Sequence, residues 1–152
     1  MSLNTTSAVI SFYSKQQDQV AGFYEQLANK KQYSSAKDSF LSLAKETHKH
    51  KEMVERAYRE VITDALEACF AFAMNEGDYV ISTDVPKDAR YPEVVRKAIE
   101  LEERQHKFCV DASQKSSCLM SDVTQAFARV AKKKLSHITT LTSLLDHKAV
   151  DA

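Results

Sequence analysis

The chain has 152 residues with only two glycines and two prolines, which favours a single domain of long helices with few turns. Its 21 basic and 21 acidic residues balance, so we expect neither a nucleic-acid surface nor an acidic tail. No apolar run reaches the roughly 20 residues that span a bilayer, so no membrane anchorage is expected. The three cysteines form no Cys-x-x-Cys pair, which excludes a cysteine-ligated metal knuckle. With no secretion signal at the N-terminus, they indicate reduced thiols and a cytoplasmic location.

Apolar residues spaced three and four apart predict four helices, over about residues 6–30, 36–72, 92–116 and 122–147. The second run is long enough to contain a break after Tyr58. Short links join the helices within each pair, and a long connection over 73–91, with Gly77 and Pro86, separates the pairs. Two amphipathic helical hairpins in this order pack best as an all-α, antiparallel four-helix bundle, here one domain over 1–152.

Polar residues interrupt the apolar stripe of every predicted helix. Residues seven apart on a helix point in nearly the same direction, within about 20 degrees. By this spacing Lys134 shares the side of Phe127 and Leu141. The other polar residues that share an apolar stripe are Gln17, Thr47, His50, Glu102 and His137. Burying unpaired polar groups is costly, so these side chains must satisfy one another, a metal ion or water.

The two predicted hairpins also resemble each other. Val20-x-x-Phe23-Tyr24 in the first helix parallels Gln105-x-x-Phe108-Cys109 in the third. Leu43-Ala44-x5-His50 in the second parallels Val130-Ala131-x5-His137 in the fourth. Equal spacing in both halves indicates an internal duplication.

With these motifs, the stretches 20–28, 40–50, 98–102 and 127–137 resemble the ferritin-like domain of the rubrerythrin family, over about residues 8–145. The resemblance implies a di-iron site with a glutamate on helices one and three and Glu-x-x-His on helices two and four. It also implies an ancestry in ferrous iron oxidation or peroxide reduction. The rubredoxin-like tail of full rubrerythrins needs four cysteines and is absent.

Carried over residue by residue, the resemblance leaves three of six metal ligands. The helix-one glutamate falls on Gln17, and the helix-two Glu-x-x-His falls on Thr47 and His50. The helix-three glutamate is Glu102, with Cys109 where a tyrosine would stand. The helix-four Glu-x-x-His falls on Lys134 and His137. One carboxylate cannot neutralise two iron ions, and an ammonium among them is repelled.

Several interpretations of these positions stay open. Lys134 can replace the metal, pairing with Glu102 and donating to Gln17 or Thr47, or its ammonium can reach solvent. His50 and His137 can be core histidines, bonded to the backbone or to each other. They can also hold one metal ion together with Glu102, with His106 as a further ligand. Tyr13, Tyr24 and Cys109 are expected to line the same interior.

The sequence therefore predicts a family member that is not an active di-iron oxidase or peroxidase. We expect a helical bundle without a cofactor that acts as a scaffold, or binds a protein partner or a small ligand, and forms a homodimer. The alternative is a metal-binding oxidoreductase with an altered, mononuclear site for iron or another divalent metal at His50, Glu102 and His137.

Overall fold

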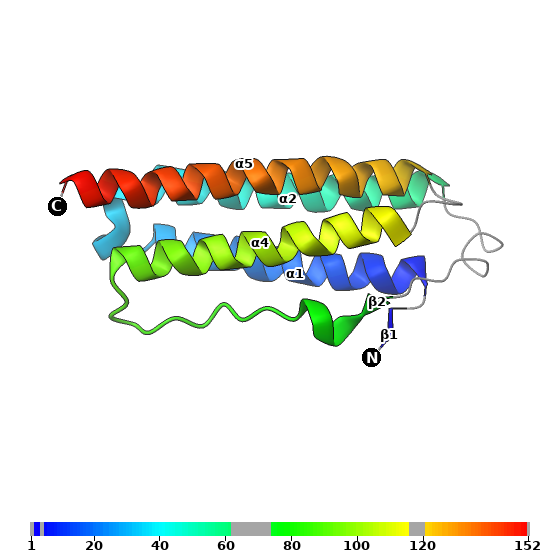
Figure 1. Cartoon of the computed structure of the whole chain (residues 1–152), viewed down its shortest axis with the longest axis horizontal. Helices are drawn as coiled ribbons and strands as arrows, with labels where there is room; N and C mark the ends of the chain where they lie inside the picture. Colours follow the sequence, from blue (N-terminus) through cyan, green and yellow to red (C-terminus); the bar gives the residue numbers. More distant parts are fainter. Residues whose placement is uncertain (1, 4, 62–73, 116–120, 152) are drawn as a thin grey trace.

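The computed structural model describes residues 2–3, 5–61, 74–115 and 121–151, and four long helices lie side by side in a bundle (Figure 1). These helices are α1 (Thr6–Ala28), α2 (Lys37–Val61), α4 (Tyr91–Lys115) and α5 (Ser121–Asp151). The short elements are the 3-10 helices η1 (Lys31–Ala36) and η2 (Glu76–Tyr79) and the strands β1 (Ser2–Leu3) and β2 (Met74–Asn75). The predicted all-α class is confirmed. None of the helices in the described ranges has the length and apolar character to cross a membrane.

The helix ends depart from the sequence prediction in specific places. α2 runs unbroken past Tyr58 to Val61, and the rest of the expected helix, with any break there, lies outside the described residues. The expected link after α1 is not irregular, because η1 leads directly into α2. α5 continues to Asp151 rather than ending at 147.

Local chemistry accounts for two helix starts. The Thr5 hydroxyl caps α1 by accepting from the Ala8 backbone amide at 3.0 Å, which satisfies one of the four amides left free at a helix start. Pro92 in the first turn of α4 lacks an amide that would have no helical partner there. Glu93 beside it interacts favourably with the positive end of the helix dipole.

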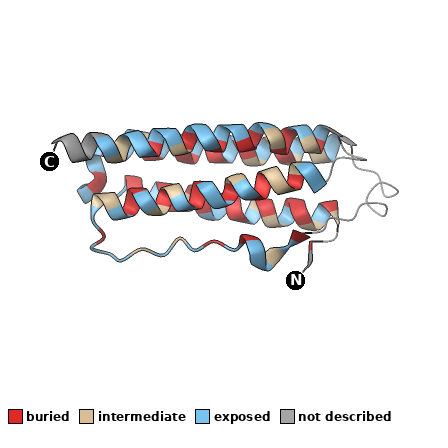
Figure 2. Ribbon diagram, viewed as in Figure 1, coloured by how far each residue is buried: buried red, intermediate tan, exposed pale blue. Residues whose placement is uncertain are grey.

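The apolar core is divided into two clusters along the bundle. One contains Tyr13, Phe108 and Phe127, and the other contains Tyr24 and Phe40. Figure 2 shows the buried positions recurring on the inner sides of the helices. The described residues of the predicted stripes are buried, apart from four that are half-buried: Ala57, Ile99, His106 and Leu144.

The long connection before α4 is held to the bundle by polar contacts at both ends. Near its start the Gln16 amide donates to the Tyr79 carbonyl, and the Tyr79 hydroxyl donates to Asp111 on α4 at 2.6 Å. Near its end the buried Tyr33 hydroxyl of η1 donates to the Ala89 carbonyl. β1 and β2 pair antiparallel next to α1, a contact that the sequence did not predict.

We expect Phe127→Ala to lower the free energy of unfolding by about 3–5 kcal/mol, because it leaves a cavity in a packed core. The Phe127 ring is fully buried and meets the Tyr13 ring edge-on, with centroids 5.3 Å apart. Urea unfolding followed by circular dichroism measures the change. Leu135→Ala, on the same helix but 50% exposed, is the matched control and should cost less than about 1 kcal/mol. Equal effects of the two substitutions would contradict this packing.

Candidate functional site

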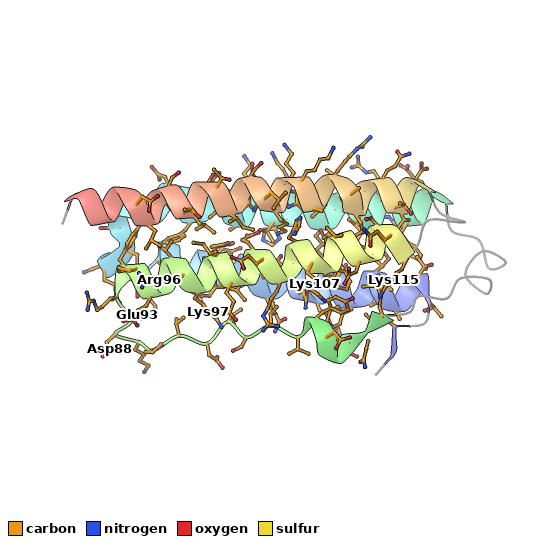
Figure 3. All side chains as sticks on the ribbon, in the orientation of Figure 1. Asp88, Glu93, Arg96, Lys97, Lys107 and Lys115 are labelled. Atoms are coloured by element: carbon orange, nitrogen blue, oxygen red, sulfur yellow. The ribbon has the colours of Figure 1, made fainter. Side chains whose placement is uncertain are left out.

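The six polar positions singled out in the sequence are all buried, and every helix of the bundle contributes at least one. Gln17 comes from α1, Thr47 and His50 from α2, Glu102 from α4, and Lys134 and His137 from α5. Side chains fill the space between the helices at this level, as elsewhere along the bundle (Figure 3). Each of these side chains is buried because it lies on the apolar face of its helix, and that face packs against the other helices.

Lys134 lies at the centre of this group and is paired. Its ammonium is 3.5 Å from Glu102 Oε2 and donates to Gln17 Oε1 at 3.2 Å, and the side chains of Lys134 and Glu102 are both 0% exposed. The expected contact between the two is thus present, and the ammonium does not reach solvent. Thr47 is not a partner, because its hydroxyl donates to the Leu43 carbonyl of its own helix at 2.7 Å.

His137 lies between the buried carboxylate of Glu102 and the half-exposed carboxylate of Glu46. Its Nδ1 lies 3.3 Å from Glu102 Oε2, and its Nε2 lies 2.5 Å from Oε2 of Glu46 on α2. The Glu46 side chain is 47% exposed, so this contact is where the buried group meets solvent. An ionised carboxylate only accepts hydrogen bonds, so a ring nitrogen of His137 can bond to either carboxylate only as an N–H donor.

Glu102 is kept ionised by its neighbours. Burial alone raises the pKa of this carboxyl, but the Lys134 charge, the His137 contacts and the Tyr24 hydrogen bond outweigh burial and lower the pKa to about 2. The Tyr24 hydroxyl donates to Glu102 Oε1 at 2.7 Å, and burial beside that carboxylate raises the tyrosine pKa. Both carboxylate oxygens are therefore bonded, and Glu102 has no need of a metal ion to satisfy it.

Two amides complete the group on the side of α1 and α4. The Gln17 amide nitrogen donates to Gln105 Oε1 at 2.8 Å, and the Gln105 amide nitrogen donates to the Leu101 carbonyl at 3.0 Å. The whole set is called the polar cluster below, and its members are Gln17, Glu46, Glu102, Gln105, Lys134 and His137.

The polar cluster includes two residues that the sequence reasoning missed. Gln105 follows Glu102 by three residues and so shares its side of the helix, a signal that was available. Glu46 precedes His50 by four residues, which also places the two on one face of α2. The signal of Glu46 is weaker, because Thr47 next to it carries the motif position and a half-exposed carboxylate resembles an ordinary surface residue.

His50 stands beside the polar cluster without a hydrogen bond. Its ring stacks on that of His137 with centroids 5.3 Å apart, and its buried Nδ1 has no partner among the described residues. Burial, with repulsion from Lys134 and His137, lowers the pKa of His50 to about 3. His50 is therefore a neutral imidazole at pH 7.

Tyr13 and Cys109, which the sequence predicts to line the same interior, are buried and apart from solvent. The Tyr13 hydroxyl has no hydrogen-bond partner among the described residues, and burial raises its pKa. Burial also raises the pKa of the Cys109 thiol to about 12, which keeps it protonated and unreactive. His106 is half-buried, and no hydrogen bond or ion pair in the described part of the chain joins it to the polar cluster.

The polar cluster does not fit the di-iron group that the family resemblance implies. Within the described ranges, no three His, Cys, Asp or Glu side chains are placed to hold one metal ion. Both ring nitrogens of His137 already face carboxylates, and an ammonium stands 3.5 Å from Glu102, the one carboxylate that the resemblance carries over as a ligand. Adding two dications would place several positive charges against Lys134 in a site with little solvent.

Comparison with known proteins gives no independent identification. No protein-family model, no characterised protein and no solved structure matches the chain. The function must therefore be argued from the polar cluster itself.

Replacing Glu102 by Gln tests the charge state of the polar cluster. A carboxyl whose pKa is lowered by folding stabilises the protein above its unfolded pKa, and this contribution is lost as the pH falls through the folded pKa. The Glu102 pKa falls from its ordinary 4.5 to about 2, which corresponds to about 3 kcal/mol present above pH 4.5. The stability difference between wild type and Glu102→Gln should therefore shrink between pH 4.5 and 2.

Unfolding in urea over a series of pH values measures that difference. Glu25→Gln is the control, since Glu25 pairs with His48 at the surface and should change stability by less than about 1 kcal/mol at any pH. A difference that stays constant across the acid range would mean that Glu102 is not ionised in the folded protein.

Proposed function

We propose that this chain is a ferritin-like member of the rubrerythrin family, built from two antiparallel helical hairpins, that acts as a metal-independent scaffold or binding module. Contacts between α1 and α2 support the first hairpin, because Ser14–Glu55, Asp18–Lys51 and Glu25–His48 follow in reverse order along the two helices. Glu102 meets both Lys134 and His137 across α4 and α5, which supports the second hairpin.

One observation carries the functional half of the proposal, namely the fully buried Lys134 ammonium beside Glu102. In a di-iron bundle the metal ions hold four helices together by their ligands. Here the polar cluster links α1, α2, α4 and α5 through hydrogen bonds and ion pairs. The polar groups of the cluster contact one another, so the bundle does not need a metal ion in order to satisfy them.

A second candidate function rests on His50. A neutral, buried imidazole with an unbonded ring nitrogen has a lone pair that a transition metal could use. His137 and Glu102 or Glu46 would have to release their present contacts to complete a mononuclear site. This candidate would make the protein a metal-binding oxidoreductase with an altered ligand set.

Metal analysis of protein purified without added metal separates the two candidates. We expect well under one metal ion per chain, and no di-iron absorbance after ferrous iron and peroxide are added, because Lys134 occupies the centre of the site. One tightly held metal ion per chain that is lost in His50→Ala would favour the second candidate. Two per chain in wild type would overturn the proposal.

A variant with three substitutions supplies the positive control. Gln17→Glu, Thr47→Glu and Lys134→Glu together restore the ligand pattern of the family, with four carboxylates and two histidines. If the ferritin-like assignment holds, this variant should bind about two metal ions per chain while wild type does not. If the folded variant gains no metal affinity, the family assignment fails, whatever wild type binds.

A further inference from the structure

A groove runs between α2 and α5 at the surface, separate from the polar cluster. It encloses about 550 Å³, a volume typical of small-molecule sites. Its walls carry three cations, Lys49 and Arg56 on α2 and Arg129 on α5. None of the three has an ion pair or hydrogen bond in the described part of the chain, although Glu52 also lines the groove.

The two arginines lie at a similar level of the bundle, one on each wall of the groove. The contact between Glu46 and His137 fixes how α2 and α5 are aligned. Arg56 lies ten residues from Glu46, and Arg129 lies eight residues from His137 on the antiparallel helix. At 1.5 Å per residue these are about 15 and 12 Å from the same contact. Two guanidinium groups thus line one short section of the groove.

The groove also has an apolar floor and an acidic far end. Met53, Ala57 and Ala126 form an apolar floor of small or adaptable side chains, which leaves room for an aliphatic segment. Beyond Arg56, towards the start of α5, the walls carry Glu60 and Asp122. Glu60 is one helical turn from Arg56, about 6 Å along the axis, so the positive and negative ends lie within one small molecule's length.

We propose that this groove binds a small zwitterion, with an oxyanion between Arg56 and Arg129, an aliphatic segment on the floor, and an amine at Glu60 and Asp122. Guanidinium groups bind carboxylate and phosphate in the same bidentate geometry, so the oxyanion can be either. An anion between the arginines relieves their mutual repulsion. None of the residues that line the groove belongs to the polar cluster, so the titrations below report on the groove and not on metal binding in the cluster.

Isothermal titration of the full chain with four probes tests the proposal. The zwitterions are 6-aminohexanoate and 3-aminopropyl phosphate, and hexanoate and propyl phosphate are the same molecules without the amine. At least one zwitterion should bind one to one, with a dissociation constant at or below about 10 mM, and several-fold more tightly than its amine-free partner. The tighter of the two zwitterions identifies the oxyanion as carboxylate or phosphate.

Variants assign the binding to the groove. Arg56→Gln and Arg129→Gln should each weaken binding at least about tenfold, because each removes a charge-assisted contact. Glu60→Gln should weaken the zwitterion but not its amine-free partner. Arg96→Gln is the control, since Arg96 is exposed on α4 away from the groove (Figure 3). The proposal is overturned if neither zwitterion binds, if the amine makes no difference, or if the arginine variants bind like wild type.

Discussion

The buried ion pair between Lys134 and Glu102 is the interaction on which the rest of the bundle depends. Taking both charges out of water costs several kcal/mol per ion, and their attraction offsets this only while the remaining hydrogen bonds are made. Gln17, Tyr24 and His137 make those bonds. The polar cluster therefore holds α4 and α5 in one register, since sliding either helix by a turn would leave a buried charge alone. We infer that it fixes the alignment of the helices more than it adds to net stability.

The helical fold and most of the buried polar positions could be predicted from the sequence, because helix geometry fixes which residues share a face. Seven-residue spacing placed Lys134 and Glu102 inside, and their contact followed from charge. This spacing does not single out Glu46, whose half-exposed side chain contacts His137 from the edge of α2. Nor does the sequence show that the Thr47 hydroxyl donates to the backbone of its own helix, because a threonine in a helix can bond either to that backbone or to a neighbouring side chain. Distant contacts, such as Tyr79 with Asp111, carry no local sequence signal.

The interface between α2 and α5 contains two regions that differ in how their charged side chains are paired. At His137 the two helices are joined by the contact between His137 and Glu46, and His50 is neutral beside them. Farther along the interface lies the groove, where Arg56 and Arg129 have no ion-pair partner among the described residues. The binding role proposed above rests on this difference between the two regions.

A double-mutant cycle on the buried pair tests the central claim most directly. Lys134→Ala or Glu102→Ala alone should each lower the free energy of unfolding by about 3–5 kcal/mol, because each leaves one charge buried without its partner. The double variant Lys134→Met with Glu102→Leu should lose much less, since both desolvation costs disappear together. The account is contradicted if the single effects are below about 1 kcal/mol and additive, because the pair would then contribute nothing to holding the helices together.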